Sequence, residues 1–356
     1  MYRVAIIGEN LGAQMAALAC RASGFEAINR FHSSDQFDHP NNTHAASSIY
    51  SFGANSSRLL RALAPSVIDT IGFAPDRYQI RFGKSAYLLS ELPLGDFYYQ
   101  RYGSGMVNFS APLLEQFLEN QLANPLQGSA ALSDVETNHE LTILSSPEDL
   151  PRPIHSNPGF LVYHATLPDH PLRKANVLWR GNGQYIEQLS DPNQIHFRFV
   201  TRADRCFSDS QWHDSLHEAL ACKVAMGGIS TDDFVASDTL FAGRVAFLHS
   251  AFSPPTLGKI DADNTALEDA WVLSRMMENY EEDIGDGLAA FERFRRPRHR
   301  KLNQQMRAHL LSLTEPSSTK RLSQHLGMAL KTRLLPEIAL QQQDWLYEHD
   351  VIKGFR

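Results

Sequence analysis

Cysteine is scarce in this chain of 356 residues, and the spacing of its few cysteines points to no site. The three have neither a pairing pattern nor the spacing of metal ligands: Cys20, Cys206 and Cys222. We therefore expect reduced thiols and a cytoplasmic protein. The histidines of the first half also lack partners at metal-ligand spacing, so we expect no metal site.

Long apolar runs and a basic excess are missing as well. No apolar run approaches the ~18 residues that a membrane-spanning helix needs, and the N-terminus has no charged n-region or cleavage site. The formal charge of −7 leaves no basic excess to neutralise phosphates. We expect neither a membrane span nor a nucleic-acid partner.

The composition that remains is that of an ordinary globular protein with a large core, at 43% hydrophobic and 21% charged residues. The chain opens with a strand at 2–7, a turn at Gly8 and a helix to about Ser23, followed by a second strand at 25–31. One helix face carries only small residues: Ala13, Ala16, Ala17 and Cys20. This order is typical of the Rossmann dinucleotide-binding opening.

The turn departs from the dinucleotide fingerprint. Glycine is expected at positions 8, 10 and 13, where the chain has Gly8, Asn10 and Ala13, with a further glycine at Gly12. Alanine is tolerable because the third glycine serves helix packing, whereas Asn10 places a side chain where the backbone should touch pyrophosphate. No carboxylate occurs after the second strand before Asp35. A Rossmann-like turn without a dinucleotide stays an open alternative.

A second strand–loop–helix unit lies at 243–280, and we expect the fold to be organised around it. An apolar strand at 245–248 leads into a proline-glycine loop and then an amphipathic helix. Free N–H groups and the helix dipole point into such a loop, which is where α/β proteins hold anionic or planar ligands. The apolar helix face carries Ala266, Ala270, Leu273, Met277 and Tyr280.

This stretch resembles one segment of the FAD-dependent aromatic hydroxylases, the class A flavoprotein monooxygenases that include salicylate and para-hydroxybenzoate hydroxylases. The matching residues are Gly243-Arg244-Val245, Pro254-Pro255, Gly258, Asn264 and Leu267-Glu268-Asp269-Ala270-Trp271. The family's Gly-Asp pair after the strand reads His249-Ser250 in this chain.

Weaker matches to the family occur in other parts of the chain, in the same order as in the family. A helix that begins with a cofactor-binding arginine in the family begins with Ser110, and 160–163 compares with the strand before the family's Gly-Ala-Asp-Gly. The run 291–298 resembles its arginine-proline signature, and we interpret these arginines as a solvated helix face. From the residues themselves, 186–200 predicts an antiparallel strand with one buried face, and 212–226 an amphipathic helix.

The resemblance implies an α/β protein with a Rossmann-like FAD/NAD(P)-binding fold, a mixed-sheet substrate domain and C-terminal helices, as in para-hydroxybenzoate hydroxylase. We expect the Rossmann-like domain at 1–75, 100–175 and 235–300. The substrate-type sheet is expected at 76–99 and 176–234, and a C-terminal helical segment at 301–356.

The resemblance also implies where FAD would bind, and four of those places differ. They read Asn10, Phe31 or its neighbours, Ser110 and Ser250. Each lost polar contact is worth ~1–3 kcal/mol, and four would remove on the order of 4–12 kcal/mol, against about 8 kcal/mol for micromolar binding. If FAD is retained, the implied contacts are Gly8, Asn10, Gly12, Ala13, Arg30, Ser110, Pro254, Pro255, Gly258 and Asn264.

Three functional hypotheses stay open. In the first, a protein of oxidoreductase lineage binds a small aromatic or polycyclic ligand in the interdomain cleft with FAD use weakened or lost. It would act as a cyclase, an isomerase or a binding subunit, with His249 and Ser250 as polar groups. In the second, Arg30 meets a phosphate and the protein is a working FAD- and NAD(P)H-dependent monooxygenase. The third is an NAD(P)-only Rossmann enzyme, which leaves the proline loop without a role.

Overall fold

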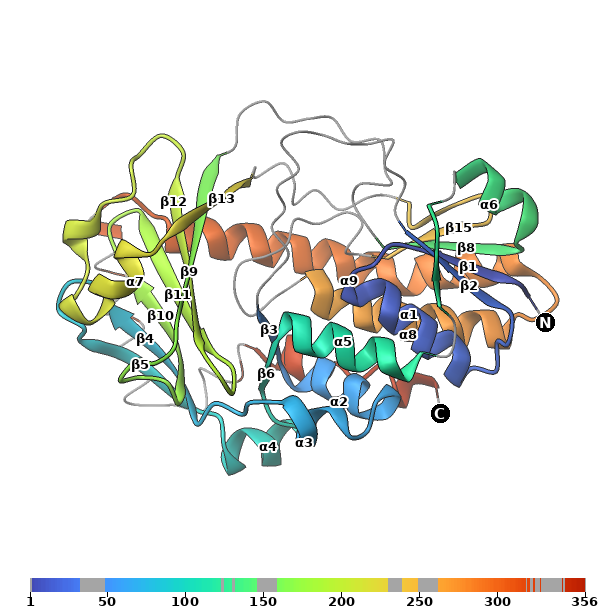
Figure 1. Ribbon diagram of the computed structural model, residues 1–356, viewed down its shortest axis with the longest axis horizontal. Coiled ribbons are helices and arrows are strands. Elements are labelled where there is room, and N and C mark those ends of the chain that lie inside the picture. Colours follow the sequence, from blue (N-terminus) through green and yellow to red (C-terminus); the bar gives the residue numbers. More distant parts are fainter. Residues whose placement is uncertain are drawn as a thin grey trace.

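The computed structural model describes residues 2–32, 49–122, 125–129, 132–145, 159–229, 239–248, 262–317 and 343–355, with the single positions 319, 320, 323, 327 and 341. Two sheets lie at opposite ends of the molecule, and the long helix α9 (Ile284–Leu313) runs from one to the other (Figure 1). Within the described ranges, no helix is long and apolar enough to cross a membrane.

A six-stranded sheet forms around the N-terminal strand, in the order β14-β15-β8-β1-β2-β7. Strand β1 runs parallel to its neighbours β2 and β8, and its four residues are buried. The predicted Rossmann-type opening is therefore confirmed. The strands are β1 (Val4–Ile7), β2 (Ile28–Phe31), β7 (Leu126–Gln127), β8 (Leu141–Leu144), β14 (Phe241–Ala242) and β15 (Val245–Phe247).

Helix α1 (Leu11–Ala22) packs against α8 (Ala262–Asn279) beside this sheet. The small residues predicted to face the core are all buried, which lets the helices lie close: Ala13, Ala16, Ala17 and Cys20. On α8 the predicted apolar face is buried from Ala266 to Met277, whereas Tyr280 follows the end of the helix and is exposed.

The second sheet has seven strands in the order β13-β9-β12-β11-β10-β4-β5. Strands β4 and β10 pair in parallel and the other neighbours pair antiparallel, so the sheet is mixed, as expected. The strands are β4 (Arg77–Phe82), β5 (Leu88–Pro93), β9 (Phe160–Leu167), β10 (Ala175–Arg180), β11 (Gln184–Ser190), β12 (Ile195–Arg202) and β13 (Val224–Ile229).

Strand β12 shows why this sheet has two different faces. Side chains alternate along a strand, and Ile195, Phe197 and Phe199 are fully buried in one apolar cluster with Trp179 and Trp212, as the alternation predicted. The residues between them, His196 and Arg198, therefore belong to the opposite face, which is turned toward the rest of the molecule.

Two local predictions were wrong. The stretch 212–226 is not one helix but a short turn η4 (Asp214–Leu216), a helix α7 (His217–Ala221) and the start of β13, which pairs with the exposed edge of β9. The stretch 186–200 is not one strand but parts of two, β11 and β12, with a turn at 191–194 between them. The strand predicted at 160–163 is confirmed as the start of β9. The predicted domain bounds stay a prediction; β9 and β10, on either side of position 175, lie in one sheet.

Helix α9 joins the cores at the two ends. Its first half contributes Leu288 and Phe291 to the core around β1, and its second half places Leu302, Met306 and Leu310 against the seven-stranded sheet. The remaining described elements are β3 (Ile49–Phe52), α2 (Ala54–Leu63), α3 (Val67–Ile71), α4 (Asp96–Tyr102), β6 (Val107–Ser110), α5 (Ala111–Gln121), α6 (Leu132–Asn138), η3 (Asp209–Gln211), α12 (Asp344–Tyr347) and η7 (Lys353–Phe355).

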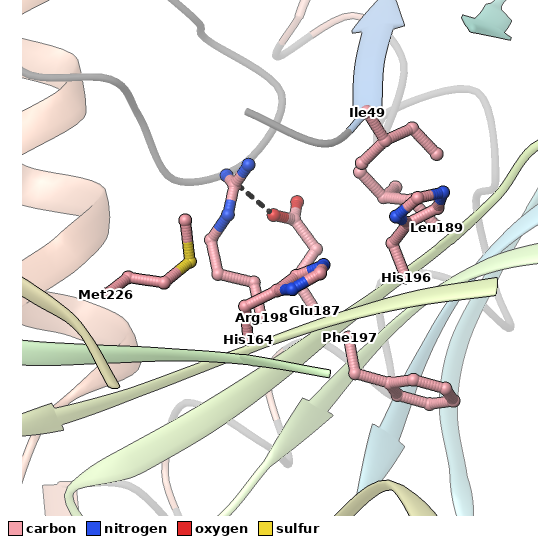
Figure 2. A pocket seen from close by; sticks show the side chains of 8 residues that line it. All are labelled: Ile49, His164, Glu187, Leu189, His196, Phe197, Arg198 and Met226. Atoms are coloured by element: carbon pink, nitrogen blue, oxygen red, sulfur yellow. Dashed lines mark hydrogen bonds and ion pairs between the residues drawn. The ribbon is translucent and has the colours of Figure 1, made fainter. Parts of the chain in front are cut away.

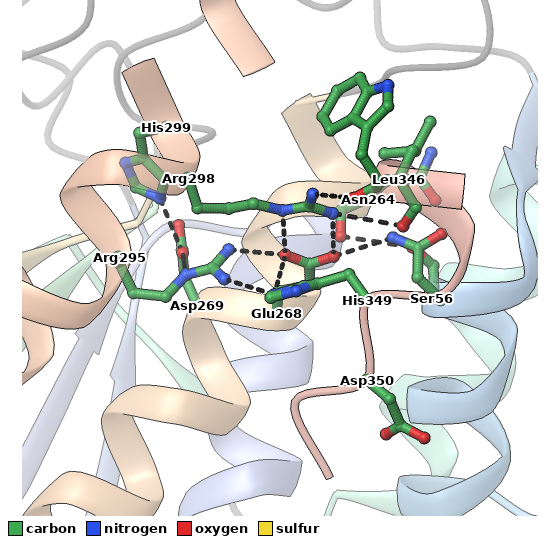
Figure 3. A network of polar contacts seen from close by, with 12 residues as sticks. Ser56, Asn264, Glu268, Asp269, Arg295, Arg298, His299, Leu346, His349 and Asp350 are labelled. Atoms are coloured by element: carbon green, nitrogen blue, oxygen red, sulfur yellow. Dashed lines mark hydrogen bonds and ion pairs between the residues drawn. The ribbon is translucent and has the colours of Figure 1, made fainter. Parts of the chain in front are cut away.

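A cluster of charged side chains is buried where α8, α9 and the C-terminal segment meet (Figure 3). Glu268 accepts hydrogen bonds from Arg295 at 2.8 Å and from Arg298 at 3.0 and 3.2 Å. Asp269 accepts a second bond from Arg295 at 2.6 Å, and His299 Nε2 lies 2.8 Å from the same carboxylate. Two adjacent acids of α8 thus bind one face of α9.

The cluster stays charged although it is dry. Burial raises the pKa of Glu268, but Arg298 and Arg295 outweigh that effect and hold the pKa well below its ordinary value. The same carboxylate accepts a bond from Asn55 of α2 at 2.8 Å. Glu268 therefore fixes α2, α8 and α9 relative to one another.

The interpretation of the arginine run as a solvated helix face was wrong for half of it. Arg295 and Arg298 are buried, whereas Arg293 is exposed and Arg296 is partly exposed. The physical reason is that Glu268 and Asp269 supply buried counter-charges on the facing helix, which composition alone does not show.

Arg298, together with Arg58, also holds the C-terminal segment 343–355 in place. Arg298 donates to the carbonyl of Trp345 at 2.7 Å, and Arg58 of α2 donates to the carbonyl of Tyr347 at 2.8 Å. The end of the chain is thereby tied to two helices that border the region between the sheets.

We predict that Glu268→Gln lowers the unfolding free energy by ~3–5 kcal/mol, because Arg295 and Arg298 would keep buried charges without their shared partner. Urea unfolding followed by circular dichroism measures the loss. Glu278→Gln on the same helix is the control, since it breaks only a half-exposed pair with Arg275 and should cost less than about 1 kcal/mol. Equal losses for the two variants would contradict the prediction.

Candidate functional site

A small pocket opens on the inner face of the seven-stranded sheet (Figure 2). The pocket is shallow, with a cavity volume of about 10 Å³, which is about the space that one water molecule needs. Strands β9, β11 and β12 supply most of the lining, with one residue each from β3 and β13: Ile49, His164, Glu187, Leu189, His196, Phe197, Arg198 and Met226.

The polar residues of the pocket form one row across three strands. In the strand register, Arg198 of β12 lies opposite His164 of β9 on one side and Glu187 of β11 on the other. Arg198 Nη1 lies 3.4 Å from Glu187 Oε2. The row therefore presents a guanidinium, a carboxylate and an imidazole side by side, which is a set of donors and acceptors for a planar polar ligand.

The two histidines of the pocket differ in their partners. His164 is half-buried, and burial, together with nearby His196 and Arg198, lowers its pKa to about 4, so the ring is neutral at physiological pH. His196 is buried and its Nε2 lies 2.9 Å from Oδ2 of the buried Asp191, in the turn between β11 and β12.

Sequence reasoning missed every polar residue of this pocket. The signal was available in β12, because the period-two pattern that placed Ile195 and Phe197 in the core also places His196 and Arg198 together on the other face. The contributions of β9 and β11 could not be read in the same way, since their register to β12 is a tertiary feature.

The predicted cofactor residues of the first turn lie where the Rossmann pattern puts them. Gly8 has a φ of 122°, a conformation that side-chain-bearing residues rarely adopt. Asn10 is the N-cap of α1, where its Oδ1 accepts from the Ala13 amide at 3.0 Å. Its Nδ2 donates to the carbonyl of Ser145, just after β8, at 2.7 Å. Gly12 and Ala13 are buried in the first turn of the helix.

Asn10 Oδ1 therefore accepts the hydrogen bond of a helix N–H group that could otherwise donate to a bound phosphate. The amides at a helix N-terminus are the usual donors to a pyrophosphate. With Ala13 capped from within the chain, and with Asn10 bridging the ends of β1 and β8, the turn satisfies part of its own hydrogen-bonding capacity.

Arg30, the cation considered for a phosphate contact, points away from the turn. It is buried between α1 and α5, and its Nη1 and Nη2 donate to the carboxylate of Glu119 at 2.8 and 2.7 Å. Gln14 of α1 lies 3.3 Å from the same carboxylate. A phosphate contact by Arg30 stays a prediction, and it would require the guanidinium to exchange partners.

The end of β2, where the family has an acid, carries Phe31 and then His32. His32 Nδ1 is hydrogen-bonded to the Glu9 carboxylate of the glycine turn. A carboxylate is thus present near the ribose position, but it comes from the turn itself and is already bound to an imidazole.

Of the other predicted contacts, Ser110 and Asn264 lie among the described residues and the rest do not. Ser110 is buried at the junction of β6 and α5, where Pro112 falls in the first turn as expected. Asn264 is buried near the start of α8 and its Nδ2 donates to the carbonyl of Ser51, while its Oδ1 has no partner. Outside the described residues lie His249, Ser250, Pro254, Pro255 and Gly258.

These residues fit the shape of a dinucleotide site better than its charge. The glycine turn, the small-residue helix and the unpartnered Asn264 oxygen suit a bound cofactor. The one predicted cation, Arg30, is consumed by Glu119, and an acid, Glu9, stands in the turn. A phosphate bound at this turn would meet the carboxylate of Glu9 and would find Arg30 already paired with Glu119.

No group of three described histidine, cysteine or acidic side chains is arranged to hold a metal ion.

Comparison of the sequence with protein-family profiles gave no match, and none was found among curated proteins. Solved structures do match. HpxO of Klebsiella pneumoniae, in complex with FAD and uric acid, has a TM-score of 0.74 at 16% identity, covering 92% of this chain and 93% of its own. A salicylate hydroxylase substrate complex has a TM-score of 0.70 at 13% identity, with coverage of 98% and 96%.

A third similar structure is PqsL of Pseudomonas aeruginosa, described as a probable FAD-dependent monooxygenase. Its TM-score is 0.65 at 14% identity, and the alignment covers 93% of this chain and all of PqsL. The chain thus has the fold of the FAD-dependent hydroxylases along nearly its whole length, and the predicted resemblance in fold is confirmed.

We predict that the His164 ring titrates near pH 4, because burial is the largest cause of its lowered pKa. NMR of histidine-labelled protein, assigned with His164→Gln, measures the midpoint. A midpoint near the ordinary value of about 6.5 would contradict the burial of this ring. The unfolded ring gains its proton at that higher pH, so unfolding free energy should fall as pH drops from about 6.5 toward 4.

Proposed function

We propose that this protein binds a small aromatic or polycyclic ligand on the inner face of the seven-stranded sheet and holds FAD weakly or not at all. It acts as a non-redox enzyme, such as a cyclase or isomerase, or as a binding subunit. The observation that carries the proposal is the row of His164, Arg198 and Glu187, whose polar groups converge on one pocket on the inner face of the seven-stranded sheet.

A flat ligand with a polar edge would lie across the mouth of this pocket, because the cavity itself holds about one water molecule. Arg198 supplies planar N–H donors, Glu187 supplies acceptors, and the neutral His164 ring can do either. Apolar side chains of Ile49 and Met226 border the same space and suit a ring face. HpxO is described with uric acid and the salicylate hydroxylase with its substrate, which are small planar molecules of this kind.

Weak use of FAD is supported by the partners that the chain gives to its own dinucleotide residues. Asn10 caps its own helix and Arg30 is paired with Glu119. His249 and Ser250, which follow β15 and Leu248 in the sequence, remain candidate polar groups of the same cleft.

The alternative is a working FAD- and NAD(P)H-dependent monooxygenase. The complexes with FAD among the similar structures favour it, because the fold is shared. Bound FAD would supply oxygen activation, and this chain's pocket would hold the substrate to be hydroxylated. The amount of FAD that the purified protein carries separates the two functions.

We predict that the purified protein lacks stoichiometric flavin absorbance and that added FAD binds with a Kd weaker than about 1 µM. The double variant Asn10→Gly, Phe31→Glu restores the expected glycine and acid and should tighten FAD binding about tenfold or more. Asn10→Ala is the control, since it removes the self-cap without restoring the glycine. Equimolar FAD in the wild-type protein would favour the monooxygenase instead.

We predict that Arg198→Gln weakens binding of uric acid or salicylate about tenfold or more, because a charged donor to the ligand is lost. Isothermal calorimetry of the flavin-free protein measures the Kd. Arg202→Gln is the matched control, as Arg202 lies on the same strand but pairs with Asp204. The pocket is not the ligand site if both variants bind like the wild type.

A further inference from the structure

A second and larger pocket lies at one end of the seven-stranded sheet, where β4 and β10 end. Its cavity volume is about 380 Å³, which falls in the range of small-molecule sites. The lining comes from the last residues of these two strands, from the turns that follow them and from η3. None of the described residues that line it also lines the pocket on the inner face of the sheet.

The two turns at this end of the sheet are held together by close packing on Trp212. Gly83 follows β4 and Gly181 follows β10. The buried indole lies so near to both that an added Cβ would be 2.8 Å from it at Gly83 and 2.9 Å at Gly181. The Gly83 amide also donates to the carbonyl of Arg180 at 2.8 Å. The position of these turns, and of the cavity beside them, is therefore set by the packing of the domain.

Gln211 of η3 carries two amide N–H donors at this pocket. Its Oε1 accepts from the backbone amide of Asn182 at 2.9 Å, and this contact identifies the oxygen end of the side chain, because only the oxygen can accept. Nε2 is therefore the other end of the half-buried side chain, and none of the described residues accepts from it. A ligand with an acceptor atom can take these hydrogen bonds.

Lys84 supplies a positive charge that a ligand can reach. Its exposed ammonium donates to the carbonyl of Ser210 at 2.7 Å, which leaves two of its three N–H groups for another acceptor. No acidic side chain occurs among the described residues that line the pocket. The nearest acid along the chain, Asp209, is paired with Lys223 at 2.9 Å. The pocket thus offers a cation without an acid in its lining.

The remaining lining residues define the rest of the ligand. Phe82, at the end of β4, adds an aromatic ring. Arg180 is buried and its Nη2 donates to the carbonyl of Ser312 on α9 at 2.8 Å, so it contributes charge beside the pocket but is not needed as a donor. One reachable ammonium, one amide and one ring suit a single carboxylate on a flat apolar body.

We propose that this pocket is a second ligand site and that it binds small aromatic carboxylates. The ammonium of Lys84 and the Nε2 group of Gln211 bind the carboxylate, and the ring system of the ligand lies beside Phe82. A monoanion is the expected class, because one exposed cation offsets one negative charge. The site is separate from the one on the inner face of the sheet, and the proposal does not depend on the function proposed for that face.

Calorimetric titration with 2-naphthoate, and with 2-naphthamide as a neutral ligand of the same shape, tests the proposal. We expect Lys84→Gln to weaken binding of 2-naphthoate at least ~fivefold, because a charge-assisted hydrogen bond is lost, and to leave the affinity for 2-naphthamide unchanged. Lys84→Arg keeps the charge and should retain most of the affinity. Lys174→Gln is the matched control: Lys174 is exposed and precedes β10, at the opposite end of that strand from Arg180.

The indole N–H signal of Trp212 reports where the ligand binds. The chain has four tryptophans, so labelled tryptophan gives few NMR signals, and the signal of Trp212 is the one missing from Trp212→Phe. We expect 2-naphthoate to shift this signal, because the indole packs on both turns of the pocket. The midpoint of the titration should be the same in Arg198→Gln, since Arg198 lines only the pocket on the inner face.

The outcomes separate the second site from the first. A weaker affinity in Lys84→Gln but not in Lys174→Gln, together with a shifted Trp212 signal, supports the proposal. Equal affinity in Lys84→Gln and wild-type protein overturns it, as does a lack of any binding of 2-naphthoate. Binding that is lost in Arg198→Gln and kept in Lys84→Gln would place the ligand on the inner face of the sheet, which overturns the second site and leaves the proposed function standing.

Discussion

The buried carboxylate of Glu268 is the constraint on which the arrangement of the cleft depends. It binds two arginines of α9 and Asn55 of α2, while its own helix α8 packs on α1 (Figure 3). A dry ion network of this kind adds little net stability compared with apolar packing, but losing one member is costly. Its effect is therefore to select one arrangement of α2, α8 and α9, and α9 carries that arrangement to the second sheet.

The two sides of the cleft differ in what their polar side chains bind. On the dinucleotide side, side chains that could face a cofactor bind other parts of the chain: Asn10 binds its own helix and Ser145, and Arg30 binds Glu119. On the sheet side, charged and titratable groups converge on a pocket instead. The fold of the FAD-dependent hydroxylases is thus combined with a row of polar side chains across β9, β11 and β12.

The fold could be predicted from sequence because its determinants are local or ordered along the chain. Buried apolar runs, small residues on α1 and the spaced family signatures fixed the identity and order of elements without any long-range contact. The predictions that were wrong concern features that depend on contacts between elements distant in the sequence. Whether 224–226 continues a helix or pairs with β9 depends on the strand beside it, and whether Arg295 is exposed depends on the acids that face it on α8.

The site was harder to predict for the same physical reason. The pocket residues come from several strands, and the hydrogen bond from His196 to Asp191 follows from the turn between β11 and β12. The resemblance to the FAD-dependent hydroxylases also placed the predicted site residues at the positions where that family binds FAD. The face of β12 opposite the core, with His196 and Arg198, was readable from alternation but carried no family signature.

A crystal structure grown with excess FAD and uric acid tests the central claim most directly, because both candidate sites are then offered their ligands at once. We predict density for the planar ligand on the inner face of the seven-stranded sheet, within hydrogen-bonding distance of Arg198, and none for FAD along the turn from Gly8 to Ala13. FAD bound at that turn, with Arg30 released from Glu119, would contradict the claim.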